Sequence, residues 1–296
     1  MNNFNKKWLY LALLSFIWGS SFILIKKGLV GFSSLQLGGL RIIFASLFLF
    51  LFGIKSLKNI SLRDWKWISI AGFLSSFFPP FFFAIAQTEI DSGITSILNS
   101  IVPLGTTLVG VWLFGLAMNK RQILGVIIGL IGTVVLILVG MEFSPNQNYW
   151  YSIFVFLSAL GYAFNINIIK KHLAHLTPLQ VTTASFGVVI IPAIIMLIYA
   201  GVLQVDFHQV EVQKALGYTF VLGVLGTAVA NIFFNKLIHI SSPVFAASVT
   251  YTIPLVAIVW GILDGEKINL YQIVGGVIIL FGVWLVNKKK NPIKEH

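Results

Sequence analysis

The sequence contains no cysteine and few charged residues. Without cysteine, disulfide bridges and thiolate metal sites are both excluded. Charged residues make up 10% of the 296 residues, whereas a soluble globular domain carries about 25%. Hydrophobic residues make up 57%, more than a water-soluble fold of this size could enclose. The chain is therefore predicted to be an integral membrane protein.

Motifs of enzymes are also missing. The chain has no HExxH and no GxSxG motif, and none of its Asp or Glu residues falls inside the ten spans given below. We therefore expect no catalytic residues, no metal and no cofactor. The net charge of +11 would suggest nucleic acid in a soluble protein, but in a membrane protein the distribution of charge matters more than its sum. No nucleic-acid partner is expected.

Apolar runs of about 20 residues, long enough to cross a bilayer, recur from end to end. No small-residue cleavage site follows the first run, so it is expected to remain as a helix. The predicted fold class is an all-α integral membrane protein with ten transmembrane helices. The predicted spans are 8–26, 34–54, 66–87, 92–114, 122–140, 149–169, 178–200, 215–236, 243–263 and 270–287.

The charges between the spans fall unevenly on the two sides. If the N-terminus is cytoplasmic, that side receives most of the Lys and Arg residues, and the other side receives most of the acids. The positive-inside rule then predicts a multi-pass protein of the plasma membrane with both termini in the cytoplasm, which agrees with an even number of spans.

The two halves of the chain resemble one another. The stretch LNSIVPLGTTLVGVWLFGLAMNKRQILGVIIGLIG is echoed by VTYTIPLVAIVWGILDGEKINLYQIVGGVIILFG, with Pro103 aligned with Pro254 and Gln122 with Gln272. The predicted repeats are residues 1–141 and 142–296, each with five helices. Because five is odd, the second repeat enters the membrane in the opposite sense, which gives an inverted repeat suited to alternating access.

Four stretches carry a resemblance to a known family: WGSSFILIK, LGGLRIIFA, SILNSIVPLGTTLVGVWL and YTIPLVAIVWGILDGEKINLYQIVGGVIILFGV. In this order they make the chain similar to the EamA-type branch of the drug/metabolite transporter superfamily over nearly its whole length. The resemblance implies two inverted five-helix halves, a central cavity and, in many members, export of amino acids or related small metabolites.

The sequence departs from the family after the fourth helix. Where the family often has Gly-Glu, this chain has Gly115 and Leu116, whereas the second repeat keeps Gly265 and Glu266. We interpret the acid as a structural element at a helix end rather than as a coupling site.

Polar residues cluster around the two matched prolines. Such groups in a membrane must be satisfied by protein or face a water-filled cavity. Asn99, Ser100, Thr250 and Tyr251 are therefore predicted to bind substrate near the middle of the membrane. The alternative is that they hold helices together, as small polar residues often do.

The first and sixth spans carry a second matched set. Trp18 and Ser21 correspond in location and character to Tyr162 and Asn165. An indole or phenol gives a flat apolar wall with one hydrogen-bonding edge, while Ser and Asn offer directional donors and acceptors. These four residues are also predicted to bind substrate, and an aromatic belt is the alternative for Trp18.

Three further positions are candidates. Asn231 lies on a polar face of the eighth span and is predicted to contact a cavity or a helix seam. Arg41, the one cation placed well inside a span, could contact a substrate carboxylate or could snorkel to the interface. Pro79, like Pro103 and Pro254, is predicted to be a helix hinge.

The function predicted from these features is secondary transport. We expect a transporter that exports small metabolites such as amino acids by alternating access, as a facilitator or an exchanger, because no acid lies within a span to couple protons or sodium. A proton-coupled antiporter and a channel or receptor are the alternatives. The expected partners are a small-molecule substrate and membrane lipid, with either a monomer or a homodimer.

Overall fold

The computed structural model describes residues 3–58, 60–115, 120–143 and 146–287, and in these residues all regular structure is helical. Nine helical stretches of the described residues are long and apolar enough to cross a membrane, and the shorter apolar helix Leu270–Leu285 makes the tenth. The predicted membrane fold with ten helical spans is confirmed. The helices are α1 (Asn3–Gly28), α2 (Ser34–Gly53), α3 (Leu62–Gly72), α4 (Phe78–Ala86), α5 (Ser92–Asn99), α6 (Val102–Phe114), α7 (Lys120–Phe143), α8 (Ser152–His172), α9 (Pro178–Tyr199), α10 (Val210–Gly223), α11 (Ala230–Ile240), α12 (Pro243–Ala247), α13 (Ile253–Leu263) and α14 (Leu270–Asn287).

The third and eighth spans are each interrupted by a π-helical turn. In the third span this turn, Phe73–Phe77, separates α3 from α4, and in the eighth span the turn Val224–Val229 separates α10 from α11. Such turns break the regular hydrogen-bond ladder of a helix and are frequent at functional sites. The two spans hold the same place in the two halves, so the irregularity is itself repeated.

The fourth and ninth spans are interrupted next to their prolines. In the fourth span α5 ends at Asn99, and α6 then begins with Pro103 as its second residue. In the ninth span a 3-10 turn, Ser248–Tyr251, leads into α13, where Pro254 is the second residue. Pro79 is likewise the second residue of α4. Proline lacks a backbone N–H and is tolerated in a first helical turn, so each proline starts a new segment, and its role as a hinge stays a prediction.

The second and seventh spans begin with the same local structure. Ser33 and Gln36 form a reciprocal capping box at the start of α2, and Thr177 and Gln180 form one at the start of α9. A capping box satisfies two backbone N–H groups that a helix start leaves without partners. The similarity between the halves therefore extends to how the helices begin.

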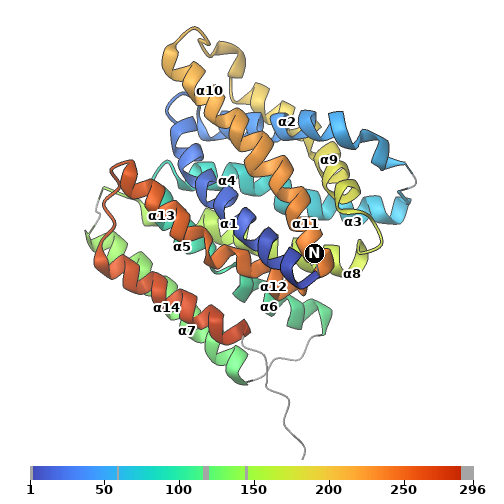
Figure 1. Ribbon diagram of the computed structural model, residues 1–296. Helices are drawn as coiled ribbons and strands as arrows, with labels where there is room; N and C mark the ends of the chain where they lie inside the picture. The colour runs from blue at the N-terminus through green and yellow to red at the C-terminus, as the bar shows by residue number, and fades with distance from the viewer. Residues whose placement is uncertain (1–2, 59, 116–119, 144–145, 288–296) are drawn as a thin grey trace, which may run out of the picture.

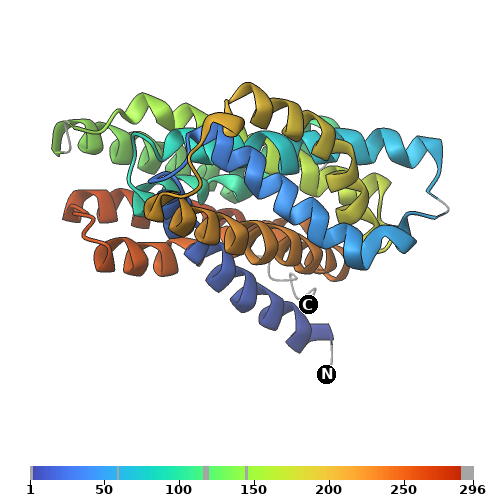
Figure 2. The same cartoon turned by 90° about the horizontal axis from the view of Figure 1, so that it is seen from above.

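The first helix of each half packs against interrupted spans of the other half. In the described residues α1 contacts α10, α11 and α13, while α8 contacts α3, α4, α5 and α6. Figure 1 shows the start of α1 and the end of α14 at the same end of the bundle. Seen from above, most helices run side by side, and the first turns of α1 diverge from them (Figure 2).

The last helices of the two halves, α7 and α14, form a close pair at one edge of the molecule (Figure 1). A Cβ atom on Gly282 would lie 2.4 Å from the backbone nitrogen of Gly129, and one on Gly132 would lie 2.7 Å from the backbone nitrogen of Ile279. Small residues let membrane helices approach this closely and gain van der Waals contact. Glycine is therefore required at this helix crossing.

Candidate functional site

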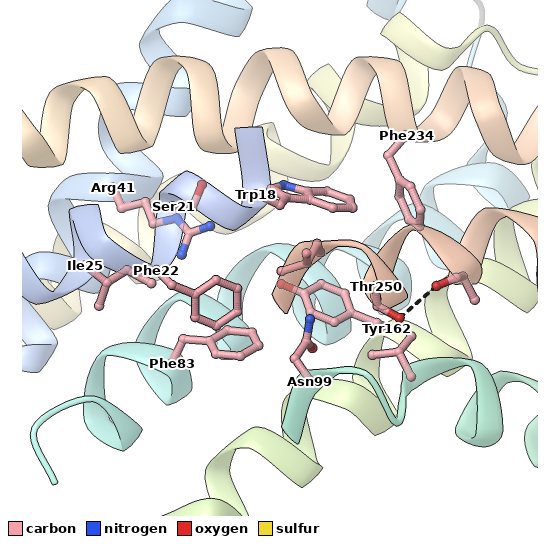
Figure 3. Close-up of a pocket in the computed structure, with 13 residues that line it drawn as sticks. Trp18, Ser21, Phe22, Ile25, Arg41, Phe83, Asn99, Tyr162, Phe234 and Thr250 are labelled. Carbon is pink, nitrogen blue, oxygen red and sulfur yellow. Dashed lines mark hydrogen bonds between the residues drawn. The ribbon is translucent and has the colours of Figure 1, made fainter. Parts of the chain in front are cut away.

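A cavity of about 50 Å³, the space open to the centres of water molecules, lies where the broken spans of the two halves meet (Figure 3). Its wall combines residues of α1, α2, α4, α5 and α6 with residues of α8, α11, α12, α13 and the turn Ser248–Tyr251. Both halves therefore contribute to one site. The lining residues are Trp18, Ser21, Phe22, Ile25, Arg41, Phe83, Asn99, Val102, Tyr162, Phe234, Ala247, Thr250 and Ile253.

Aromatic rings form much of the cavity wall, and they are held in fixed orientations. Phe22 and Phe83 meet edge to face with their centroids 5.6 Å apart, and Trp18 meets Phe234 at 4.9 Å. The indole N–H of Trp18 donates to the carbonyl oxygen of Gly226, in the π-helical turn of the eighth span, at 3.0 Å. Because this N–H is already satisfied, Trp18 presents its apolar ring to the cavity.

Among the described residues that line the cavity, Arg41 is the one with a permanent charge, and only 7% of it is exposed. Its Nε donates to the hydroxyl of Thr227 at 2.7 Å. That hydroxyl in turn donates to the carbonyl of Leu222, five residues earlier, at 2.9 Å, which is the spacing of a π turn. Arg41 is therefore buried by the irregular turn of the eighth span. The alternative that it snorkels to the interface is wrong.

Asn99, Thr250 and Tyr162 line the same cavity (Figure 3). The hydroxyl of Thr250 donates to the carbonyl of Ala247 at 2.9 Å. The side-chain oxygen of Asn99 is buried and accepts no hydrogen bond from the described residues. A buried acceptor without a donor costs free energy, so this oxygen stands out as an unsatisfied polar atom of a cavity-lining residue.

Four of the residues predicted to bind substrate are not on the wall of this cavity. Ser100 donates to the carbonyl of Thr250 at 2.9 Å, which joins the break in the fourth span to the break in the ninth. Asn231 donates to the carbonyl of Thr227 at 2.7 Å, and the Tyr251 hydroxyl lies 3.5 Å from the carbonyl of Val283. Asn165 is buried in α8. The hydrogen bonds of Ser100 and Tyr251 match the alternative of polar groups that join helices. The hydrogen bond of Asn231 stays within the eighth span.

Trp18, Ser21, Asn99, Tyr162, Thr250 and Arg41 do line the cavity, and their role in binding stays a prediction. The apolar part of the wall was not predicted, because Phe, Ile, Val and Ala are ordinary in any membrane helix. The residues missed in this way are Phe22, Ile25, Phe83, Val102, Phe234, Ala247 and Ile253.

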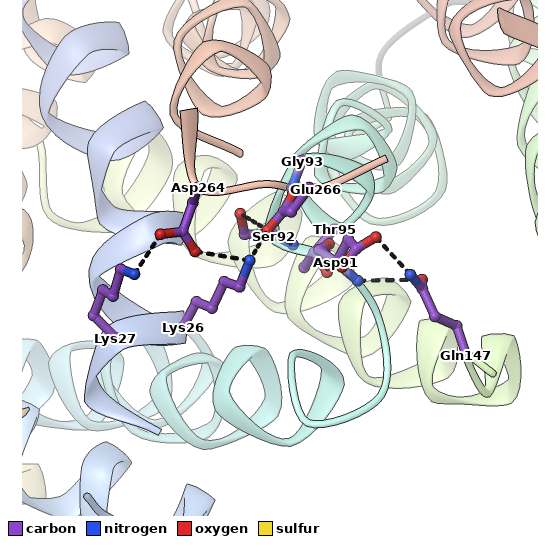
Figure 4. Close-up of polar contacts among 9 residues, drawn as sticks. All are labelled: Lys26, Lys27, Asp91, Ser92, Gly93, Thr95, Gln147, Asp264 and Glu266. Atoms are coloured by element: carbon purple, nitrogen blue, oxygen red, sulfur yellow. Dashed lines mark hydrogen bonds and ion pairs between the residues drawn. The ribbon is translucent and has the colours of Figure 1, made fainter. Parts of the chain in front are cut away.

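A second polar cluster lies at one end of the bundle, centred on Glu266 (Figure 4). One carboxylate oxygen of Glu266 accepts from the backbone N–H of Ser92 at 3.1 Å, from the Ser92 hydroxyl at 2.6 Å and from Lys26 at 3.0 Å. The other oxygen accepts from the backbone N–H of Gly93 at 3.0 Å. Glu266 therefore caps the start of α5 and joins α1 to the end of the ninth span, as expected for a structural acid at a helix end.

Asp264 and Asp91 surround this cluster. Asp264 forms ion pairs with Lys26, at 2.9 Å, and with Lys27. Burial opposes ionisation of Asp264, but hydrogen bonds from Lys27 and Lys26 outweigh it and hold its pKa below the usual value. Asp91 is partly buried and accepts from the Gln147 amide at 2.5 Å. Burial raises the pKa of Asp91.

The matching position in the first half differs in sequence. Gly115 and Gly265 both adopt left-handed backbone, with φ of 68° and 85°, a region open to glycine without steric cost. Glu266 follows Gly265, whereas Leu116 follows Gly115. Leu116 lies outside the described residues. We call Glu266 and its contacts with Lys26, Ser92 and Gly93 the carboxylate clamp. Its acid comes from the second half of the chain.

Comparisons with known proteins agree with this architecture. The model of the EamA-like transporter family matches residues 6–138 and again 149–288. The uncharacterized inner membrane transporter YedA of Escherichia coli (strain K12) is 26% identical over 283 residues, which cover 94% of this chain and 89% of that protein. The uncharacterized transporter YdfC of Bacillus subtilis (strain 168) is 24% identical over 291 residues, covering 96% and 92%.

One relative has a more specific name. The probable amino-acid metabolite efflux pump of Escherichia coli (strain K12) is 24% identical over 282 residues, covering 91% of this chain and 90% of that protein. A solved crystal structure shares the fold, with a TM-score of 0.64 and 15% identity over 94% of this chain and 95% of the other. Because the family model matches both halves, the chain is a multi-pass membrane protein of the EamA-like transporter family.

Proposed function

We propose that the protein exports small metabolites such as amino acids by alternating access. The observation that carries the proposal is the cavity, whose wall is shared by both halves and lies at their repeated helix breaks. Inverted-repeat transporters bind substrate at such an interface and expose it to each side in turn. The amino-acid class is supported by the relative named as a probable amino-acid metabolite efflux pump.

In this proposal the wall residues have different tasks. Arg41 binds a carboxylate, because a guanidinium is matched in charge and shape to that group. Asn99 accepts a hydrogen bond from the substrate, and Trp18 and Tyr162 contact its apolar part. Ser21 and Thr250 add hydroxyl groups nearby. The three prolines, Pro79, Pro103 and Pro254, let the broken spans bend as the cavity opens to one side or the other.

The transport mode we propose is facilitative or exchange. None of the described residues on the cavity wall is Asp or Glu, and proton or sodium coupling usually requires an intramembrane carboxylate or an array of carbonyl oxygens. We also propose that the protein lies in the plasma membrane with both termini in the cytoplasm, following its positive charges. A relative is named as an inner membrane transporter, which supports this location.

Efflux from proteoliposomes tests the function. Vesicles holding the purified protein are loaded with a mixture of amino acids and small metabolites, and release is followed by mass spectrometry with and without a pH gradient. We expect selective release of amino acids that continues without the gradient. Release that stops when the pH gradient is collapsed would instead support a proton-coupled antiporter, and ionic conductance without selective release would support a channel.

A further inference from the structure

Arg41 is a buried charge that lacks a charged partner. In the described part of the chain its hydrogen-bond partner is the neutral hydroxyl of Thr227 at 2.7 Å, and no carboxylate lies within ion-pair distance of it. The acids at the end of the bundle, Asp264 and Glu266, are already paired with lysines. An arginine cannot lose its proton in a protein, so it cannot relieve this burial by becoming neutral.

The surroundings of Arg41 indicate what would neutralise it. The guanidinium shares the cavity wall with Phe22, Ser21 and Asn99 (Figure 3). The side-chain oxygen of Asn99 has no hydrogen-bond partner among the described residues. A carboxylate fits the fork of an arginine with two parallel hydrogen bonds. An apolar or aromatic group on the same solute would pack against the rings, and a hydrogen-bond donor on the solute would satisfy Asn99.

We propose that this protein is an exchanger of solutes that carry a carboxylate, because the solute's carboxylate forms an ion pair with Arg41 and lets the loaded cavity close and reopen. The inference rests on the proposed transport function and adds the charge of the substrate and the mode of transport to it. With a carboxylate bound, the closed cavity holds a paired charge. Without it, closing the cavity would enclose a single unpaired cation, which is costly in a low-dielectric interior.

The kinetic consequence follows from this difference. After releasing its substrate, the carrier must return through a closed state, and that return is slow when the cavity is empty. A carboxylate on the receiving side speeds the return by entering the cavity. A tenfold difference in return rate requires a barrier difference of only about 1.4 kcal/mol. We therefore expect release to be at least about tenfold faster when the receiving side contains substrate.

The test uses the full-length protein in proteoliposomes loaded with an isotopically labelled mixture of neutral amino acids. Release is measured into buffer alone, into buffer with the same unlabelled amino acids, and into buffer with their carboxamides, which lack the carboxylate. We expect external amino acids to accelerate release at least about tenfold and the carboxamides to give no acceleration. Equal release into all three solutions would overturn the exchange mechanism while leaving the transport function standing.

Two variants assign the effect to the charge. In Arg41→Met the acceleration by external amino acids should disappear, whereas Thr227→Val, which removes the neutral partner and keeps the cation, should retain it. Persistent acceleration in a folded Arg41→Met protein would contradict the proposal. If that variant does not fold, the comparison of amino acids with carboxamides in the unmodified protein decides the question. Absence of release from the unmodified protein in every solution would refute the transport function itself and the exchange mechanism with it.

Discussion

Glu266 and Arg41 are both buried charges, with 8% and 7% of their surfaces exposed, yet the protein surrounds them in opposite ways. Glu266 has hydrogen-bond donors on both carboxylate oxygens, from α1 and from the start of α5. Arg41 has one neutral partner and faces a cavity. Removing a partner from a buried charge that the chain satisfies completely is strongly destabilising, whereas a buried charge left without a counter-charge is available to a ligand.

Removing the carboxylate of Glu266 should lower the free energy of unfolding more than any other substitution considered below. Glu266→Ala leaves two backbone N–H groups of α5 without an acceptor, so we expect a loss of about 3 kcal/mol in the free energy of unfolding. Reversible unfolding in detergent micelles measures it. Glu211→Ala is the matched control, because Glu211 is an exposed acid at the start of α10, and it should change stability by less than about 0.5 kcal/mol. Equal effects in the two variants would show that Glu266 is not a structural clamp.

A second substitution tests the other wall of the cavity. Asn99→Ala removes an oxygen that accepts no hydrogen bond from the described residues, so the free energy of unfolding should change by no more than a few tenths of a kcal/mol. Release of amino acids should fall about tenfold if a substrate donor uses this oxygen, corresponding to about 1.4 kcal/mol. Ser100→Ala is the paired variant, because Ser100 joins two helix breaks and is not on the wall. It should lower stability more than Asn99→Ala does.

Lys26 contacts both acids of the cluster, Glu266 and Asp264. Lys26→Met removes one partner each from Glu266 and Asp264 and leaves the backbone donors of α5 in place. The Lys26 side chain is 33% exposed, and partly exposed ion pairs contribute little. We expect a loss of about 1 kcal/mol or less, clearly below that of Glu266→Ala. A larger loss than for Glu266→Ala would mean that the lysine, and not the helix cap, holds this end together.

The stability contributed by the ion pairs of Asp264 should depend on pH, and this effect should be smaller than those above. The pKa of Asp264 is held below its ordinary value of 3.8 by Lys27 and Lys26. A lowered pKa in the folded state means that this ion pair stabilises the protein fully above pH 3.8 and that the contribution is lost as the pH falls through the lowered value. Asp264→Asn should therefore be less stable than the unmodified protein at pH 7, and the difference should shrink below pH 3.8. A difference that is constant with pH would exclude the ion pair as its source.

The sequence predicted the spans because a bilayer demands long apolar helices, and the two aligned prolines marked the breaks. The site was predictable only where a polar residue stood out from an apolar run, as with Arg41 and Asn99. Phe22 and Phe83 could not be identified, since nothing distinguishes a ring on a cavity wall from one in contact with lipid.

Other features depend on contacts between distant parts of the chain. The sequence does not reveal that Ser100 donates to Thr250, 150 residues away, or that Lys26 pairs with Glu266, 240 residues away. The burial of Arg41 depends on the π-helical turn Val224–Val229, which brings Thr227 to it. That turn had no clear sequence signal, and without it the choice between a buried and a snorkelling arginine stayed open.

The contrast between the two buried charges is tested most directly by measuring the unfolding midpoint and the amino-acid efflux of Arg41→Met side by side with the unmodified protein. If Arg41 is kept for a substrate carboxylate, the variant should be at least as stable as the unmodified protein and should lose most of its efflux in proteoliposomes. A variant that is strongly destabilised, or one that is stable and still exports amino acids at the original rate, would contradict this account.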